Sequence, residues 1–381
     1  MQKLKRWLRY VLQNHKILQK AYALASRIKY KITHYREERE KRKDYTKTVI
    51  EATQKIEEYQ NKDYIVFYNP EWLGVANSTK GLFQNNIPLK QVFGKKNCHR
   101  VVRAIVKGNN KTVIFSQIVE GWITIIKELK ERKPFLKIKV IWHGNCYEFF
   151  SDYTWNLNKE VLNLCQKRKI DGIGFVRSTM YEFYKKLGIP VYYLQNNVHI
   201  QGKKETEKQQ DEMEKDTLRV GIYNADSREL KNLYTALSAI ALLPKAKADV
   251  VPINQGAKEF AQILNLSIES IDHYIETSEL MKRVKKNTIN LYPTYTENAP
   301  MFPLESFELG VICLVGNNND YFIGTPLEPY VVLKKEDDAV AIKNQVLYCL
   351  AHKEEIMTLY QEWKKEFDKK CEKWVQQFIG E

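Results

Sequence analysis

Several features that would by themselves assign this sequence to a class of protein are missing from it. Its 381 residues contain no run of eighteen apolar residues, so no membrane-spanning helix is expected, and the first segment lacks the continuous apolar core of a signal peptide. The six cysteines are scattered, without a Cys-x-x-Cys pair or a zinc-like spacing to histidine, which favours reduced thiols in a cytosolic protein. A hydrophobic fraction of 44% indicates packed globular domains, and the length predicts two of them.

Acidic residues are scarce at one end of the chain. Residues 1–47 hold fifteen Lys or Arg side chains and only four Asp or Glu, which accounts for most of the formal net charge of +15. Apolar side chains recur there at spacings of three and four, with cations between them, at Leu4, Trp7, Leu8, Val11, Leu18, Tyr22, Ala25 and Ile28. We predict a basic amphipathic helical extension over residues 1–60, whose residues 1–40 contact an anionic membrane surface.

One other interpretation of this basic segment remains open. A helix packed on the body of the protein, with a solvated basic face, gives the same pattern. Nucleic-acid binding is not expected, because the cations share their helix with a Trp and Leu face and no recognition motif accompanies them. Residues 36–58, which are rich in charges of both signs, are expected to form a solvated helix or connector.

Strand-like and helix-like segments alternate over the rest of the chain, which predicts parallel sheets covered by helices on both faces. The first series has strands at 64–68, 112–116, 138–142, 172–176 and 191–194 and helices at 119–132, 157–168 and 178–187. The second has strands at 218–222, 249–253, 288–292 and 311–315 and helices at 228–243, 256–264, 276–285 and 353–378. Between the two series, the polar stretch 201–216 is predicted to be an interdomain linker.

The segment 295–310 is the most informative part of the sequence. Glu297 and Glu305 stand eight positions apart, and Pro303 is predicted to begin a helix that carries Glu305 and ends at Gly310, before a buried strand. A loop and helix N-terminus in an α/β domain favour a phosphorylated ligand, because free backbone N–H groups and the helix dipole attract an anion. Two carboxylates beside such a site can accept hydrogen bonds from sugar hydroxyls.

This pattern resembles the Glu-x7-Glu signature of retaining nucleotide-sugar glycosyltransferases, in particular glycosyltransferase family 4. The resemblance covers residues 63–375 in layout, and it implies an α/β protein of the GT-B fold, with two Rossmann-like domains facing a cleft and the N-terminal basic helical extension added. The implied parts are an N-terminal acceptor domain at 61–200, a linker at 201–216, a nucleotide-sugar donor domain at 217–352, and a C-terminal helix at 353–381 that packs back on the first domain.

The resemblance also implies roles for individual residues. Glu297 contacts the hydroxyls of the transferred sugar, together with His143 at the end of the predicted strand 138–142. Glu305 holds the ribose of the nucleotide. Lys231 and Arg228 neutralise the donor diphosphate and so stabilise the departing nucleoside diphosphate. For His143, a structural role in capping its strand is the alternative.

Five further residues complete the implied site. Asn298, Ala299 and Met301 line the donor pocket and offer backbone N–H groups to the diphosphate. Gly74 and Asn77, in the first strand–helix loop, belong to an acceptor or phosphate loop, although an ordinary turn explains them as well. No metal and no cofactor are expected, since the resemblance implies metal-independent transfer and no Asp-x-Asp pair stands in a suitable loop.

The sequence departs from the family's pattern at two places. Ile312 stands where a proline is usual, and Gly221 is followed by Ile222 instead of the arginine that ends the first strand of the donor domain. Outside the signature, Ser178 is predicted to be the N-cap of a helix. The missing arginine raises the alternative of a catalytically silent GT-B protein that acts as a glycan-binding or partner subunit.

The function predicted from the sequence is transfer of a sugar from a nucleotide-diphosphate sugar to a saccharide acceptor, with a lipid-linked acceptor suggested by the basic extension. Synthesis of a bacterial surface polysaccharide or glycoconjugate would use such an enzyme. A cytoplasmic protein held peripherally at the inner face of the cell membrane is the matching localisation.

Overall fold

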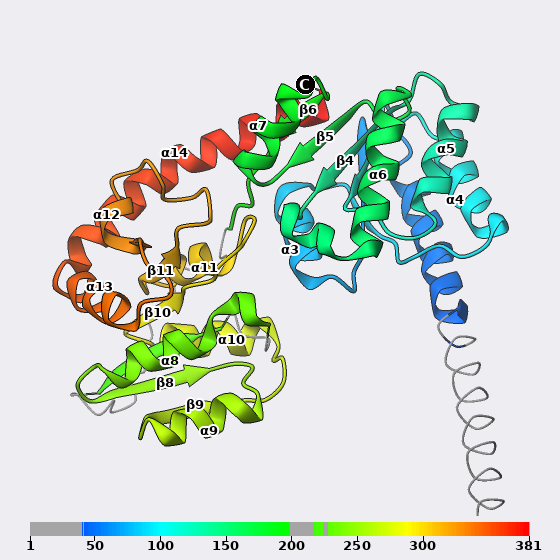
Figure 1. The fold of residues 1–381 in the computed structure, drawn as a ribbon. Helices are drawn as coiled ribbons and strands as arrows, with labels where there is room; N and C mark the ends of the chain where they lie inside the picture. The colour runs from blue at the N-terminus through cyan, green and yellow to red at the C-terminus, as the bar shows by residue number, and fades with distance from the viewer. Residues whose placement is uncertain (1–39, 41, 199–216, 224–227, 381) are drawn as a thin grey trace, which may run out of the picture.

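The computed structural model describes residues 40, 42–198, 217–223 and 228–380, which form two lobes, each built on a parallel six-stranded sheet (Figure 1). The expectation of an α/β protein with two Rossmann-like sheets is thus confirmed. Residues 1–39 and the 201–216 stretch lie outside the described residues, so the predicted membrane contact and linker are not described by the structure.

The first sheet has the order β2-β1-β3-β4-β5-β6. Its strands are β1 (Tyr64–Tyr68), β2 (Asn86–Pro88), β3 (Thr112–Ser116), β4 (Lys137–Trp142), β5 (Gly172–Phe175) and β6 (Val191–Tyr193). Its helices are α3 (Leu73–Leu82), α4 (Lys95–Lys107), α5 (Trp122–Arg132), the 3₁₀ helix η1 (Cys146–Phe150), α6 (Asp152–Gln166) and α7 (Ser178–Lys186). The chain places β2 and β3 on opposite sides of β1, which is where an open α/β sheet forms its ligand crevice.

Residues 42–58 form a helix, one of the two forms expected for 36–58, but one face of this helix is buried and not solvated. Its Val49, Ala52 and Ile56 are fully buried, and they belong to the same apolar core as Ile65 and Phe67 of β1. The mixed charges occupy the outer face, and the spacing of three and four places one apolar stripe against the sheet.

The second sheet has the order β12-β11-β10-β7-β8-β9. Its strands are β7 (Leu218–Ile222), β8 (Ala246–Val250), β9 (Ser267–Ser270), β10 (Ile289–Tyr292), β11 (Cys313–Gly316) and β12 (Val332–Leu333). Its helices are the 3₁₀ helix η2 (Glu229–Lys231), α8 (Leu233–Ala241), α9 (Gln255–Ile263), α10 (Thr277–Lys285), α11 (Phe302–Glu308), α12 (Glu328–Val331) and α13 (Ala339–Ala351).

The short helix α11 follows the sequence prediction closely. Pro303 lies in its first turn, and the helix ends one residue before Leu309. Gly310 then takes a φ of +81°, a left-handed conformation that glycine adopts without steric cost. The Val311 amide returns to the Ser306 carbonyl at 3.0 Å, which closes the helix end and directs the chain into β11.

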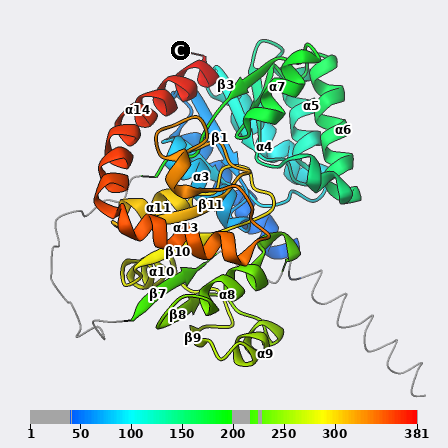
Figure 2. The same cartoon turned by 60° about the vertical axis from the view of Figure 1, so that its left-hand side comes forward.

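The long helix α14 (Lys353–Ile379) runs from α13 to the first lobe, where it ends beside β6 (Figures 1 and 2). Its buried Phe378 packs against Phe83 and, edge to face, against Tyr192, whose ring centroids lie 6.4 and 5.4 Å away. Lys139 of β4 donates to the Phe378 carbonyl, and burial lowers the pKa of this lysine to about 8. One helix therefore joins the cores of both lobes.

A second junction corrects the prediction for Ser178. This residue is the first of α7, and its hydroxyl donates to Asp320 Oδ1 at 2.9 Å instead of capping the helix. Asp320, from the loop after β11 in the other lobe, also accepts the Ser178 backbone N–H. Arg177 and Tyr193 contact the same carboxylate at 3.6 and 3.2 Å. A carboxylate from the second lobe thus caps a helix of the first, a partner that local sequence could not indicate.

Candidate active site

A cavity of about 620 Å³ opens where the two lobes meet. One wall comes from the residues after β4 and from η1 and α6, and the other from η2 and the loop after β10. The lining residues are Asn145, Tyr147, Glu148, Phe150, Ser151, Thr154, Arg228, Glu229, Leu230, Lys231, Thr296, Glu297 and Asn298. Both walls lie at carboxyl ends of parallel strands, the general position of ligand sites in such sheets.

Glu297 forms the polar centre of this cavity. Its Oε1 forms an ion pair with Lys231 Nζ and accepts a hydrogen bond from the Tyr292 hydroxyl at 2.9 Å. The Lys231 ammonium also lies 5.7 Å from the centroid of the Tyr292 ring, a cation–π contact. Burial and the neighbouring Glu297 charge raise the pKa of Tyr292 well above its ordinary value, so its hydroxyl remains a donor. Lys231, Glu297 and Tyr292 therefore form a connected, largely buried polar group.

Hydrogen bonds across the cavity hold the loop that carries Glu297. Asn145 Nδ2 donates to Thr296 Oγ1 at 2.9 Å and to the Glu297 carbonyl at 3.4 Å. The Tyr295 backbone N–H donates to the Leu230 carbonyl at 2.9 Å, which ties η2 to the same loop. The loop is thus fixed from both lobes.

Glu148 and Asn298 face each other across the lobes. Asn298 Nδ2 donates to Glu148 Oε1 at 3.4 Å, while Asn298 Oδ1 is buried and has no hydrogen-bond partner within the described part of the chain. Burial raises the pKa of Glu148, and the Asn298 hydrogen bond and the Arg228 charge oppose that rise. A ligand hydroxyl donating to Asn298 Oδ1 would remove the cost of this unsatisfied group.

His143 lies directly after β4 but does not line the cavity. Its Nε2 is 2.8 Å from Ser116 Oγ, which lies 2.6 Å from Thr79 Oγ1 of α3. The His143 backbone N–H donates to Gln117 Oε1 at 3.0 Å. Burial lowers the pKa of His143 to about 4, so the ring is neutral at physiological pH. A neutral imidazole held by such a hydroxyl relay has a fixed orientation.

Glu305, Ala299 and Met301 do not line this cavity. Glu305 is on α11, where burial raises the pKa of its carboxyl to about 7, and it does not line the cavity. The Ala299 carbonyl accepts a 2.6 Å hydrogen bond from Asn196 Nδ2, so its role in the structure is to join the lobes. Met301 is partly buried against the apolar core of the second lobe. Lys231, Arg228, Glu297 and Asn298 are therefore the predicted residues that the fold brings together.

Gly74 and Asn77 do not form the predicted loop. Both are within α3, and neither lines the cavity between the lobes. A Cβ at Gly74 would meet nothing within 4 Å, and the residue does not have a positive φ, so its backbone does not require glycine. The turn after β1 closes at Trp72, whose backbone N–H donates to the Asn69 carbonyl, so α3 begins at Leu73 and includes both residues.

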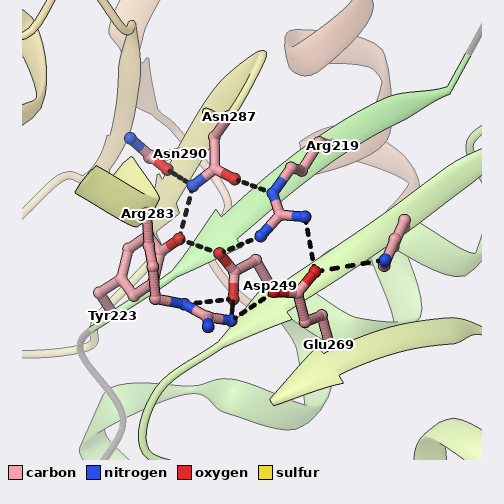
Figure 3. Close-up of polar contacts among 8 residues, drawn as sticks. Arg219, Tyr223, Asp249, Glu269, Arg283, Asn287 and Asn290 are labelled. Carbon is pink, nitrogen blue, oxygen red and sulfur yellow. Dashed lines mark hydrogen bonds and ion pairs between the residues drawn. The ribbon is translucent and has the colours of Figure 1, made fainter. Parts of the chain in front are cut away.

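A charged network lies within the second lobe, around the buried Asp249 (Figure 3). The fully buried Asp249 of β8 forms ion pairs with Arg219 of β7 at 2.7 Å and with Arg283 of α10. It also accepts a hydrogen bond from the hydroxyl of Tyr223, which follows β7. Arg219 bonds Glu269 of β9 at 2.7 Å, and this bond lowers the pKa of Glu269 to about 2. The network therefore links three adjacent strands with the start of the segment that leads to η2.

Two asparagines extend this network to α11. Asn287 Nδ2 donates to Tyr223 Oη at 2.7 Å and to Asn290 Oδ1 at 2.8 Å, and Asn290 Nδ2 donates to Ser306 Oγ at 2.7 Å (Figure 3 shows the asparagines). A Cβ on Gly221 would collide with both asparagine side chains. Glycine at 221 is therefore required by tertiary packing in this chain.

The structure adds site residues that the sequence analysis did not single out. Asn145, Glu148 and Tyr292 contact the loop of Glu297, and Tyr147 and Phe150 line the opposite wall. The sequence position of Asn145, Tyr147, Glu148 and Phe150 could have indicated them. Residues 143–150 directly follow a predicted strand, and the carboxyl ends of such strands carry ligand-binding residues. Which of these side chains point across the cleft depended on the packing of the two lobes.

Comparison of the sequence with family models and with curated proteins found no match. Solved structures do match. A trehalose-6-phosphate synthase has a TM-score of 0.59 at 11% identity, covering 84% of this chain and 98% of its own. A sucrose-phosphate synthase from Thermosynechococcus elongatus has a TM-score of 0.55 at 13% identity, covering 77% and 81%. A structure described as trehalose-6-phosphate from E. coli bound with UDP-2-fluoro glucose has a TM-score of 0.54 at 11% identity, covering 83% and 98%. These likenesses establish that the chain has the GT-B fold.

Proposed function

We propose that this protein is a retaining glycosyltransferase that moves a sugar from a nucleotide-diphosphate sugar to a saccharide acceptor. The observation that carries the proposal is the group of Lys231, Glu297 and Tyr292 in a cavity between the two sheets of a GT-B fold. A structure similar to this chain was solved bound with UDP-2-fluoro glucose, which supports a nucleotide sugar as the donor class.

The chemistry of the cavity suits this reaction. Transfer breaks the bond between the sugar and the diphosphate, so negative charge grows on the leaving group. Lys231 and Arg228 place two cations in one wall of the cavity, where they stabilise that charge. Glu297 accepts hydrogen bonds from the hydroxyls of the transferred sugar. His143 and Glu305 do not line this cavity, so the contacts proposed for them, with the transferred sugar and with the nucleotide ribose, rest on the sequence resemblance alone.

The alternative of a catalytically silent subunit rests on the missing arginine after Gly221. The structure gives that position to Ile222, which is fully buried, and the next side chain, Tyr223, is bonded to Asp249. Neither Ile222 nor Tyr223 therefore supplies the positive charge that the missing arginine would bring to the cavity. Arg228, which lines the cavity from just before η2, is the residue we propose to replace it.

Donor binding is the first test. Calorimetric titration with UDP-, GDP- and dTDP-sugars is expected to show binding of one nucleotide class, with CMP-sugar as the comparison that lacks a diphosphate. Lys231→Met is expected to weaken that binding about 10- to 100-fold, because a charge-assisted contact to the diphosphate is lost. Lys335→Met is the matched control, since this exposed lysine of the same lobe does not line the cavity.

The outcomes separate the two functions. Donor binding followed by slow hydrolysis, and a transferred sugar that keeps its anomeric configuration by NMR, is expected of a transferase. Absence of binding to every nucleotide sugar would reject the transferase. Binding without hydrolysis or transfer to any acceptor would favour the silent subunit.

We further propose a lipid-linked acceptor in surface polysaccharide or glycoconjugate synthesis, with residues 1–40 holding the protein to the membrane. The charge pattern of that segment supports the proposal. Along the residues that the structure describes, no helix combines the length and apolar character needed to cross a bilayer. Deletion of 1–40 is expected to abolish co-sedimentation with vesicles containing anionic lipid while donor affinity is unchanged. Full co-sedimentation of the shortened protein would contradict this.

A further inference from the structure

Two aromatic side chains are exposed on the wall of the cavity that faces Glu297. Tyr147 is 48% exposed and Phe150 is 87% exposed, and both line the cavity. Exposed aromatic groups in a concave surface lose favourable burial unless a ligand covers them. The functions proposed for Lys231 and Glu297 on the opposite wall do not use this aromatic surface.

The local structure holds the two rings on one face. Tyr147 and Phe150 are three residues apart in the 3₁₀ helix η1, whose repeat of three residues per turn places them one above the other. Their ring centroids lie 5.5 Å apart at an interplanar angle of 59°. The intervening Phe149 turns inward and packs on Trp142 and Trp155, with centroids at 6.3 and 5.7 Å. This inward anchor fixes η1, so the outer pair is presented to the cavity by a packed support.

Polar groups surround the aromatic pair. Asn145, Glu148 and Ser151 line the cavity beside it, and Glu148 lies 3.4 Å from Asn298, the neighbour of Glu297. A surface that combines an aromatic face with a rim of amide, carboxylate and hydroxyl groups fits a pyranose ring. The ring's C–H face carries slight positive charge and meets the negative face of an aromatic ring, while its hydroxyls reach the polar rim. An acyl chain at the same place would bury the rim groups without hydrogen bonds.

We propose that Tyr147 and Phe150 form the subsite for the acceptor, and that they bind it by stacking on a sugar ring. This inference rests on the proposed function, since it takes the wall of Lys231 and Glu297 to be the donor side. The Glu148–Asn298 and Asn145–Thr296 contacts place η1 directly against the loop of Glu297. An acceptor hydroxyl on a ring stacked at η1 is therefore directed toward the transferred sugar. The ring that the enzyme recognises next to the reaction centre is a saccharide, whatever carrier is attached beyond it.

The test uses methyl α- and β-glycosides of glucose, galactose and N-acetylglucosamine as acceptor probes. Their binding to the full-length protein in the presence of UDP, GDP or dTDP is followed by saturation-transfer NMR, and transfer is followed with the donor that calorimetry selects. Phe150→Ala and Tyr147→Ala are each expected to raise the Kd and the KM of the best glycoside about tenfold, with donor Kd and donor hydrolysis unchanged. Phe150→Tyr, which keeps an aromatic face, is expected to retain acceptor binding.

Two controls separate stacking from loss of apolar surface or of fold. Phe135→Ala removes a phenylalanine that is 98% exposed but lies at a different cavity, and it is expected to leave every constant unchanged. Phe150→Leu keeps an apolar side chain without an aromatic face, and it is expected to impair glycoside binding nearly as much as Phe150→Ala. Retention of acceptor binding in Phe150→Leu would overturn sugar stacking in favour of an apolar ligand.

Other results also overturn the inference. Unchanged acceptor constants in both alanine variants, or absence of glycoside binding to the unaltered protein, would show that this wall is not an acceptor-sugar subsite. If the unaltered protein binds no nucleotide sugar, the proposed transferase function is rejected. That result differs from a failure of the acceptor subsite, in which the donor binds and the glycosides do not.

Discussion

Glu305 shows at the scale of a residue how a carboxyl group can be held where its ionised form is unfavourable for stability. Its carboxyl is removed from water on α11, and this burial raises its pKa to about 7. An acid of ordinary pKa near 4.5 in the unfolded chain is then ionised at neutral pH, while the folded protein resists ionising it. Such groups are common where a ligand later supplies the missing hydrogen bonds.

Replacement of Glu305 by glutamine is expected to stabilise the protein at high pH. Between pH 4.5 and 7 the folded protein binds more protons at this site than the unfolded chain, so stability falls as pH rises through that window and is level above it. Glu305→Gln removes the dependence and is expected to gain roughly 2 kcal/mol at pH 8, after allowance for partial exposure. Urea denaturation at pH 5 and pH 8 measures this gain.

The matched control for this prediction is Glu362→Gln, which changes an exposed carboxylate on α14. It is expected to show no such pH-dependent gain. Equal pH dependence of the Glu305 and Glu362 variants would show that the Glu305 carboxyl is well solvated in the folded protein. Nucleotide affinity measured on the same Glu305 variant is expected to fall, so stability and binding change in opposite directions.

At the scale of the element, strand β8 shows why a charged residue misled the sequence analysis. The apolar run after Asp249 predicted a strand at 249–253, whereas the strand is Ala246–Val250. Asp249 is near its end, fully buried, and neutralised by Arg219 and Arg283 from neighbouring elements. The hydropathy pattern around Asp249 cannot predict these partners, because they come from β7 and α10, which are distant in the sequence.

Asp249→Asn is expected to destabilise the second lobe by about 3 kcal/mol, because two partly buried arginines lose one of the two carboxylates with which they pair. The Glu269 carboxyl, with its pKa lowered to about 2, remains charged at neutral pH and cannot compensate by itself. Urea denaturation at pH 7 measures the loss, and faster hydrogen exchange in β7 and β8 locates it. Asp272→Asn, at an exposed residue paired with His273, is the control and is expected to stay within about 0.5 kcal/mol of the unaltered protein. A similar effect of both changes would contradict the network's role.

At the scale of the whole molecule, separate contacts fix the two lobes around the cavity. Asp320 caps α7 of the other lobe, Asn196 bonds the Ala299 carbonyl, and α14 packs Phe378 into the first core. The cavity between Glu297 and η1 exists only because these contacts hold the lobes at this spacing. A change in any of them is expected to alter the site without touching it.

Asp320→Ala is expected to loosen the lobes, because it uncaps α7 and leaves Arg177 without its ion pair. Small-angle scattering should show a larger radius of gyration, and amides in the first turn of α7 should exchange faster. Asp338→Ala removes a cap that acts within one lobe, where Asp338 Oδ1 accepts from Val340 and Ala341 at 3.0 and 2.9 Å. This control is expected to weaken α13 alone, and the same scattering change in both variants would argue against an interlobe role for Asp320.

Most of the fold could be predicted from the sequence, because the signals for its helices and strands are local. The apolar runs of β1, β3 and β7 were placed at their observed bounds, and α11 was found from Pro303 and Gly310. The strands β2 and β9 were missed because they are short and partly polar, and β12 because it has only two residues; α4 was missed as well. The helix at 42–58 was among the predicted forms, but its full solvation was wrong, because three apolar residues among many charges are enough to bury one face.

The sequence by itself determined the α/β class, the two sheets, and the grouping of Glu297 and Glu305 on one loop and helix, because periodicity, turn residues and helix ends act within a few residues of each other. Only the tertiary structure decided that Lys231 pairs with Glu297, that Asp320 caps a helix of the other lobe, and that Tyr147 and Phe150 face the cavity. These contacts join residues far apart in the chain, and their geometry is fixed by the packing of two lobes, which no local pattern encodes.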